Sequence, residues 1–216
     1  MMRIAITQRV ERIASHGESR DCLDQRWAAL LENLGIDLLP VPNGLVHPDA
    51  WLERQDISGL ILSGGNDLSH QPGAQNASRE RDRTEMALLS LARARTLPVL
   101  GVCRGMQMLN HFLGGRLVPV SGHAGCLHPV SALARDPRFD RYSEVNSFHN
   151  WGIGLEELAS DLTPMVQADD RSIEAAIHQT LPWIGIMWHP ERPSDNAERD
   201  ARLILHLFSA KDQPCA

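Results

Sequence analysis

The sequence has little positive charge, few cysteines, few aromatic residues and no hydrophobic run of membrane length. Its 21 basic residues are outnumbered by 27 acidic residues, so the formal net charge is −6, and Lys211 is the single lysine. An acidic chain of this kind lacks the basic face that nucleic acid requires, and we expect no nucleic-acid partner. No apolar run approaches the roughly 20 residues of a membrane helix, and we expect no membrane contact.

The four cysteines, Cys22, Cys103, Cys126 and Cys215, show no spacing typical of a disulfide framework. The first six residues resemble the start of a strand more than a cleavable signal, so we expect a reducing, cytoplasmic environment. With 216 residues and 24.0 kDa, the chain is long enough to bury its core without disulfides or structural metal. We treat residues 1–216 as one domain, because no linker or low-complexity segment interrupts them.

Short apolar runs alternate with helical patterns in the first half of the chain. This half has expected strands at 3–7, 38–41, 59–62 and 99–102, and expected helices at 23–34, 79–96 and 104–113. In the second half, strand-like runs at 126–130, 143–147, 165–168, 173–178 and 184–188 precede a last helix after Ser194. The pattern predicts an α/β fold: an open, mostly parallel sheet flanked by helices, with an added antiparallel portion from the second half.

Cys103 stands between an expected strand and an expected helix, in the segment Gly101-Val102-Cys103-Arg104-Gly105. This is the G-x-C-x-G form of a nucleophile elbow, in which a strained turn exposes the nucleophile and flanking glycines avoid clashes. A thiol at a helix N-terminus is favoured as the reactive thiolate. The alternative is a buried structural cysteine beside two incidental glycines.

The segment Trp188-His189-Pro190-Glu191 offers the base and the orienting group that a cysteine nucleophile needs. Residues two apart in an extended segment point the same way, so Glu191 can lie behind His189 and hold its tautomer. A histidine before proline is also typical of a turn at a strand end. Chain order therefore leaves the pairing of His189 with Cys103 open.

The motifs around Cys103 and His189, with three further segments in the same order, resemble the class I glutamine amidotransferase-like fold, in its gamma-glutamyl hydrolase branch. The further segments are residues 63–65, 128–130 and 145–149. The resemblance covers nearly the whole chain. It implies a flavodoxin-like α/β fold and hydrolysis of a small gamma-glutamyl amide, with no cofactor and no metal.

The resemblance also implies a role for each site residue. Cys103 would be the nucleophile, His189 the general base and then acid, and Glu191 its orienting group. Attack on the amide carbonyl would release the amine and leave a glutamyl thioester for water to cleave. The oxyanion donors would be backbone N–H groups of Arg104 and of the Gly64-Gly65 loop. Further substrate contacts would come from Asn66, Gln107, Ser147, Phe148 and His149.

The chain departs from this family where the leaving amine would bind. Asn150-Trp151 stands where relatives often carry His-Gln, and residues 7–9 and 20–27 replace a long loop after the first strand. These departures put gamma-glutamyl-aminobutyrate, the branch's commonest substrate, in doubt. The replaced segments are most similar to enzymes that free a cytidine diphosphoramidate from its gamma-glutamyl conjugate in capsule synthesis. A diphosphate needs cations, and Arg9, Arg20 and Arg26 are the candidates unless they lie on a solvated face.

Two further functions have support in the residues. A glutaminase subunit that delivers ammonia to a synthetase would share this chemistry. Because no synthetase domain follows in the sequence, we expect a stand-alone hydrolase without an obligate synthetase partner. His123, Cys126 and His128 suggest a zinc module, but their spacing would need a fourth ligand. We expect Cys126 and His128 to belong to a strand instead.

Overall fold

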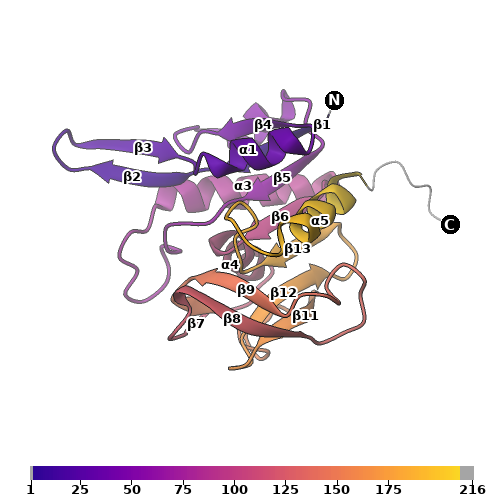
Figure 1. The fold of residues 1–216 in the computed structure, drawn as a ribbon. Helices are drawn as coiled ribbons and strands as arrows, with labels where there is room; N and C mark the ends of the chain where they lie inside the picture. The colour runs from indigo at the N-terminus through magenta and orange to yellow at the C-terminus, as the bar shows by residue number, and fades with distance from the viewer. Residues whose placement is uncertain (1, 210–216) are drawn as a thin grey trace.

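The computed structural model describes residues 2–209, and a sheet of nine strands runs through its centre (Figure 1). The strand order is β4-β1-β5-β6-β13-β12-β11-β8-β9. Strands from β4 to β13 pair in parallel, and each pair from β13 to β9 is antiparallel. The predicted α/β fold, a parallel sheet extended by an antiparallel portion, is confirmed.

The parallel half of the sheet contains the strand ends at which ligands bind in open α/β folds. Its strands are β1 (Met2–Thr7), β4 (Ile36–Val41), β5 (Gly59–Leu62), β6 (Val99–Val102) and β13 (Trp183–Ile186). Their order is that of a flavodoxin-like sheet, in which ligands lie beyond the carboxyl ends of the strands. Ser63, Cys103 and His189 all follow such ends.

The antiparallel half continues the same sheet from β13 outward. It consists of β12 (Ile173–His178), β11 (Leu162–Ala168), β8 (Ala124–Ala132) and β9 (Glu144–Phe148). Two short strands, β7 (Val118–Pro119) and β10 (Trp151–Gly152), form a separate pair that the sequence analysis did not predict. This pair holds the chain that leaves β9.

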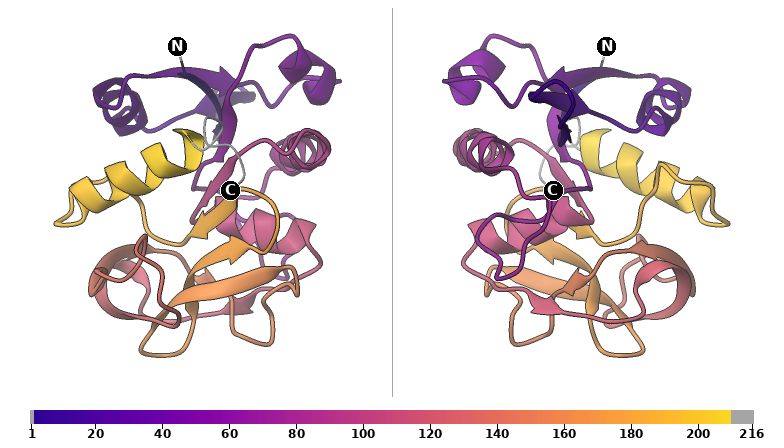
Figure 2. Two further views of the ribbon diagram at one scale, coloured as in Figure 1. Left: turned by 90° about the vertical axis from the view of Figure 1, so that its right-hand side faces the viewer. Right: turned by 90° about the vertical axis from the view of Figure 1, so that its left-hand side faces the viewer.

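Helices cover both faces of the sheet, as Figure 2 shows. One face carries α1 (Arg26–Asn33) and α5 (Ala197–Ser209), and the other carries α2 (Pro48–Glu53), α3 (Arg79–Ala94) and α4 (Arg104–Phe112). Neighbouring residues of a strand point to opposite faces, so Ile4 and Ile6 join the core under α1 and α5, whereas Ala5 joins the other core. Neither face of the parallel strands is left to solvent.

The hairpin of β2 (Arg9–Ile13) and β3 (Glu18–Cys22) was not predicted, and it projects from the body of the protein in Figure 1. Its sequence is mostly charged and its side chains are largely exposed, so it lacks the apolar alternation typical of a strand. The expected helix at 23–34 starts later, at Arg26, and the short helix α2 was missed. Within residues 2–209, the structure contains no helix that is long and apolar enough to cross a membrane.

Candidate active site

Cys103 occupies a sharp turn between β6 and α4. Its backbone φ is +53°, in the left-handed region that non-glycine residues seldom adopt. The Cys103 N–H donates a hydrogen bond of 2.8 Å to the Ile186 carbonyl oxygen, which ties the turn to β13. Strained residues of this kind cluster at functional sites, and the side chain is nearly buried at the helix N-terminus.

The two glycines of the G-x-C-x-G motif are sterically required. A Cβ atom on Gly105 would lie 2.0 Å from the Leu62 carbonyl oxygen, and one on Gly101 would lie 2.7 Å from the Gly105 carbonyl carbon. Both distances are far below van der Waals contact. The helix can therefore start directly against β5 and β6 only when both positions are glycine.

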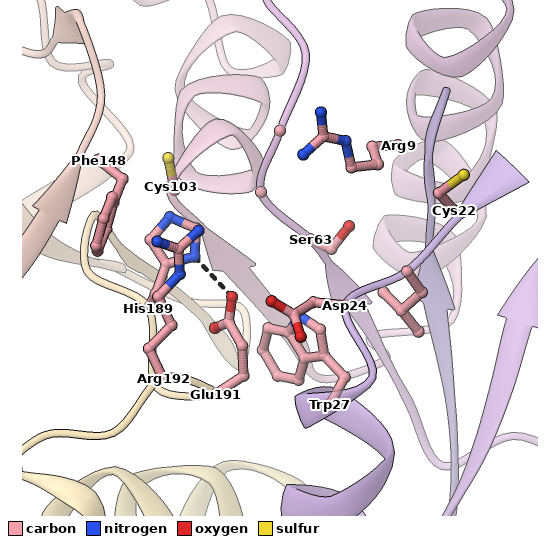
Figure 3. A pocket seen from close by; sticks show the side chains of 13 residues that line it. Arg9, Cys22, Asp24, Trp27, Ser63, Cys103, Phe148, His189, Glu191 and Arg192 are labelled. Atoms are coloured by element: carbon pink, nitrogen blue, oxygen red, sulfur yellow. Dashed lines mark hydrogen bonds and ion pairs between the residues drawn. The ribbon is translucent and has the colours of Figure 1, made fainter. Parts of the chain in front are cut away.

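His189 and Glu191 lie in the segment that follows β13. The Nδ1–H of His189 donates to Glu191 Oε1 at 2.7 Å, and both side chains are buried (Figure 3). The Phe148 ring meets the His189 ring edge to face, with centroids 5.6 Å apart. The predicted pairing of His189 with Glu191 therefore exists, and it leaves Nε2 of the ring as the free nitrogen.

Cys103 and His189 are neighbours under the loop that contains Gly64. A Cβ atom on Gly64 would lie 2.7 Å from His189 Cε1 and 3.5 Å from Cys103 Cβ. Burial disfavours a charged imidazole, but the Cys103 sulfur and the Glu191 carboxylate outweigh it and raise the pKa of His189 to about 10. An imidazolium beside the sulfur is the arrangement that activates a cysteine as a nucleophile.

The buried Arg81 side chain orients the loop after β5. Its guanidinium donates to the carbonyl oxygens of Ser63 (2.6 Å), Gly64 (3.1 Å) and Gly65. In a trans peptide the N–H points opposite to the carbonyl. The N–H groups of Gly64 and Gly65 therefore point away from Arg81, which leaves them as candidate oxyanion donors.

The Arg104 side chain points into the protein, away from a substrate. Its guanidinium pairs with Glu85 and Asp82 of α3, and Glu85 also accepts from Thr7 Oγ1 at 2.7 Å and from Arg81 Nε at 2.9 Å. Burial opposes ionisation of Glu85, but Arg104 and Arg81 prevail and hold its pKa below the ordinary value. The predicted oxyanion donor at Arg104 is thus its backbone N–H, which has no intrahelical acceptor in the first turn of α4.

Sequence reasoning missed Arg81 and Glu85. They belong to the charged stretch Arg79-Glu80-Arg81-Asp82-Arg83-Thr84-Glu85, which is typical of a solvated helix face. Arg81 and Glu85 are nevertheless completely buried. Only their spacing of four residues indicates an ion pair, and it cannot reveal burial.

Cys103 lies between two cavities. The first, of about 170 Å³, is lined by His189, Glu191, Trp27, Phe148, Arg192, Arg9 and Cys22, with Arg9 and Cys22 across from His189 in Figure 3. The second, of about 190 Å³, is lined by Gly65, Asn66, Arg104, Gln107, Phe148, His149 and Trp151, and Arg9 lines it too. A substrate bound across Cys103 would place different groups in the two cavities.

Most of the predicted contacts to the glutamyl group use their polar side-chain atoms within the protein. Asn66 bonds the backbone of Val10, Gln107 Nε2 donates to the Trp151 carbonyl oxygen at 2.8 Å, and Ser147 Oγ donates to that of His123 at 2.6 Å. The two nitrogens of His149 face the Trp151 carbonyl oxygen and Glu174. Phe148, in contrast, is partly exposed and lines both cavities.

Comparison with known proteins assigns the chain to a family. The Peptidase C26 profile matches residues 3–191. The chain belongs to the Peptidase C26 family. This assignment and the relatives described next confirm the resemblance to class I glutamine amidotransferases that the motifs suggested, and they support a hydrolase of gamma-glutamyl amides.

This Peptidase C26 member is similar to proteins with different names, and three of them are described here. It is 35% identical over 211 residues to gamma-glutamyl-CDP-amidate hydrolase of Campylobacter jejuni, covering 96% of this chain and 98% of that protein. It is 31% identical over 172 residues to the carbamoyl phosphate synthase small chain of Nitratidesulfovibrio vulgaris, covering 79% of this chain and 41% of that one. A solved structure of a presumed GMP synthase subunit from Thermoplasma acidophilum has a TM-score of 0.72 at 22% identity, covering 98% of this chain and 96% of that one.

Two arginines line the cavity of this Peptidase C26 member that contains Cys22, and a third lines an adjoining cavity. Arg9 lines that cavity and forms an ion pair with Glu11. Arg192, which the sequence analysis missed, stacks with its Cζ 3.7 Å from the Phe148 ring centre, and its Nε is buried without a partner within residues 2–209. Arg192 and Phe148 also line an adjoining cavity of about 440 Å³, where Arg26 lies.

Arg9, Arg20 and Arg26 are each about half exposed and paired with a carboxylate, but Arg20 lines none of the cavities described here. On the projecting hairpin, its Nε donates to Glu18 Oε2 at 2.8 Å, and both side chains are about half exposed. This is the solvated position that the sequence analysis kept as the alternative. The sequence could have suggested Arg192 only through its place directly after the His-Pro-Glu segment. The orientation of its side chain depends on the stacking with Phe148.

Proposed function

We propose that the protein is a cysteine-dependent hydrolase that splits a gamma-glutamyl amide whose leaving amine carries phosphate. The gamma-glutamyl conjugate of cytidine diphosphoramidate fits best, and the product would serve capsule phosphoramidate synthesis. The observation that carries the proposal is the position of Cys103 between a polar cavity of about 190 Å³ and a cavity of about 170 Å³ bordered by Arg192, with Arg9 lining both. The similarity to the Campylobacter jejuni hydrolase along almost the whole chain supports the same substrate.

The first half-reaction uses the Cys103–His189 pair. The thiolate attacks the gamma-carbonyl carbon, and the negative charge that develops on the carbonyl oxygen is stabilised by N–H groups of Arg104 and of the Gly64-Gly65 loop. His189 then donates its proton to the leaving nitrogen as the C–N bond breaks. Glu191 holds Nδ1 of the ring, so Nε2 is the nitrogen that delivers the proton.

The second half-reaction uses the neutral imidazole that remains. His189 removes a proton from water, and the resulting hydroxide attacks the thioester carbon. The tetrahedral intermediate collapses with loss of the Cys103 thiolate and release of glutamate. The thiolate and the imidazolium are thereby restored, and the steps use only these side chains and water.

The cation set explains how an acidic protein would accept a substrate with two phosphates. The net charge of −6 repels such a substrate, so local arginines must offset it. The guanidinium of Arg192 is already stacked and partly desolvated, and it can form paired hydrogen bonds to phosphate. Arg9 faces the same cavity, and Arg26 borders the adjoining one, where the nucleoside end would extend.

The test compares Arg192→Met, Arg9→Met and Arg26→Met on two substrates, gamma-glutamyl-CDP-amidate and gamma-glutamyl-aminobutyrate. We expect Arg192→Met and Arg9→Met to lower kcat/KM for the phosphate substrate by about tenfold or more, or roughly 1.4 kcal/mol, and barely to affect the other. Arg20→Met is the matched control, because Arg20 pairs with Glu18 in solvent. Equal losses on both substrates, or none on either, would contradict the phosphate assignment.

The likeness to the carbamoyl phosphate synthase small chain favours a second candidate, a glutaminase subunit that supplies ammonia to a synthetase. Glutamine itself distinguishes the two. A glutaminase would release ammonia from glutamine faster when its synthetase is present, whereas the proposed hydrolase acts alone and prefers the larger gamma-glutamyl conjugate. Pull-down from the source cell followed by glutaminase assays measures this directly.

A further inference from the structure

Three histidine rings surround one glutamate behind the segment 147–151. His123 precedes β8, His128 lies within it, His149 follows β9, and Glu174 lies in β12. The Glu174 carboxylate is 3.8 Å from His123 Nδ1, 3.5 Å from His128 Nε2 and 3.7 Å from His149 Nε2. The glutamate and two of the rings are buried, and His128 is largely buried. None of these four groups takes part in the steps derived for Cys103.

The atoms that face one another in this cluster have no partners. Within residues 2–209, His123 Nδ1, His128 Nε2, His149 Nε2 and Glu174 Oε2 are all buried and form no hydrogen bond. Glu174 Oε1 lies 3.4 Å from Ser172 Oγ, whose single proton is donated to Asp170 Oδ1 at 2.7 Å. A fully buried carboxylate with so little compensation is costly, and the site needs a positive charge at its centre.

The distances fit a shared metal ion better than direct hydrogen bonds. A nitrogen that donates to oxygen lies about 2.7–3.2 Å from it, and all three separations exceed that range. Two ligands of a tetrahedral zinc ion, each about 2.0–2.2 Å from the metal, are roughly 3.3–3.6 Å apart. The observed 3.5–3.8 Å is close to this spacing, with His123 and His149 facing Oε1 and His128 facing Oε2 of Glu174. The ligand atoms of His123, His128 and Glu174 all lie within 4.8 Å of one another.

The outer nitrogens of two rings are already oriented. His123 Nε2–H donates to Asp170 Oδ2 at 3.0 Å, and His149 Nδ1–H donates to the Trp151 carbonyl oxygen at 3.0 Å. Asp170 is itself held by Ser172, whose Oγ donates to it at 2.7 Å. A histidine that donates one nitrogen outward presents a lone pair on the other, which is the arrangement around metal-bound histidines.

We propose that His123, His128, His149 and Glu174 form a binding site for one divalent zinc ion. Three imidazoles and one carboxylate are ligands that suit zinc, and four protein ligands close the coordination shell, as in structural sites. The metal would join β8, β12 and the chain after β9. Because His149 and Trp151 also line the cavity beside Gln107, it would hold the wall of the glutamyl cavity without touching the reacting atoms.

This site departs from the expectation that the protein uses no metal. His123 and His128 belong to the zinc module considered from the sequence, but Cys126 does not. Its Sγ lies 3.0 Å from the Gly122 carbonyl oxygen, and the residue lines the cavity that contains Arg26. Glu174 of β12 and His149 after β9 complete the set of ligands. No spacing in the sequence connects these two residues to His123.

The test measures zinc binding to the full-length protein in a Cys103→Ala background, which removes the catalytic thiol as a competing ligand. Chelator-treated protein is titrated with Zn²⁺ against a chromophoric chelator, and bound metal is counted by mass spectrometry. We expect one zinc ion per chain, with binding weakened at least tenfold by Glu174→Gln or His128→Asn. Cys126→Ser, on the same strand as His128, should bind like its parent.

Failure of the parent to bind zinc, or binding by both ligand variants as tight as that of the parent, would overturn the proposal. Two measurements on the parent keep the test valid if the variants fold poorly. Co²⁺ should give the intense visible bands of a four-coordinate site without a thiolate charge-transfer band. Zinc at about 100 times its Kd should raise the Tm by roughly 5–10 °C. A thiolate band, or an unchanged Tm, would show that this cluster does not hold the metal.

Discussion

The side-chain amide of Asn146 forms two hydrogen bonds with the backbone of His189. Oδ1 accepts from the His189 N–H at 2.9 Å, and Nδ2 donates to the His189 carbonyl oxygen at 3.0 Å. Asn146 lies in β9, at the far edge of the antiparallel half, so the two halves of the sheet meet at the candidate base. Asn146 stands within the motif 145–149 but was not predicted as a site residue.

Asn146→Ala should therefore impair the position of His189. The change leaves the buried His189 N–H unpaired, at a cost of about 1–3 kcal/mol, and leaves the His189 carbonyl oxygen with the Arg192 N–H alone, at 3.2 Å. We expect kcat to fall about tenfold or more with a smaller change in KM. Asn196→Ala is the matched control, because the buried Asn196 bonds the Glu144 carbonyl oxygen at 2.7 Å at the other end of β9. Equal falls in kcat would mean that Asn146 acts only through stability.

Cys103→Ala should abolish hydrolysis and preserve the fold, because it removes the nucleophile and little buried volume. Cys22→Ser and Cys126→Ser should each keep a substantial fraction of the activity; Cys215, for which we expect the same, lies outside the described residues. Iodoacetamide should label Cys103 fastest, since the adjacent imidazolium favours its thiolate. Peptide mapping by mass spectrometry checks this order, and fastest labelling of another cysteine would contradict the assignment.

Glu191→Gln should shift the alkaline limb of the pH profile. His189 has its pKa raised to about 10, so the imidazolium that protonates the leaving amine is present below that pH and is lost as the pH rises through it. Removal of the Glu191 charge lowers this pKa. We expect the fall in kcat/KM to move from near pH 10 toward neutral pH, with a moderate loss at the optimum.

His189→Asn should be nearly as damaging as Cys103→Ala, because no other group described in the site can transfer the proton. The double variant should be hardly worse than either single variant, since residues that act as a unit do not contribute additively. Rate measurements on all three variants test this. Losses that multiply would show that Cys103 and His189 act in separate steps.

Glu85→Gln should destabilise the fold strongly. Breaking a buried ion pair by removal of one partner costs about 3–5 kcal/mol, because the charges of Arg81 and Arg104 lose their shared partner. The folded-state pKa of Glu85 is lowered, so its stabilisation is present above the ordinary value of 4.5 and is lost as the pH falls below it. Urea unfolding of the variant should therefore differ most from wild type near pH 7 and least at low pH.

Glu53→Gln is the control for Glu85→Gln. Its partner Arg95 is 3.1 Å away, and both side chains are nearly half exposed. Solvent screens such a pair, and we expect its loss to cost less than about 1 kcal/mol. A similar loss in the free energy of unfolding for the two variants would show that the ion pairs of Glu85 do not support the loop after β5 and the start of α4.

The sequence by itself determined the local parts of this protein. The elbow at Cys103 depends on two glycines within two residues of the cysteine, and the His189–Glu191 pair joins residues two apart in the sequence. The expected extended segment is instead a turn, closed by the hydrogen bond of 3.2 Å from the Arg192 N–H to the His189 carbonyl oxygen. The parallel strands and their helices follow from periodic apolar residues. Each of these features depends on contacts between near neighbours or on a repeated pattern, which a linear sequence displays.

Only the tertiary structure decided what lies behind the site. Arg81 and Glu85 stand in a charged run that predicts a solvated face, and they are buried because α3 packs against the loop after β5 and the start of α4. Likewise, Arg192 acquires its direction from Phe148, and His123 acquires its neighbours from β12. The physical reason is the same in each case: whether a polar side chain is solvated, paired or left facing other lone pairs depends on elements far away in the chain.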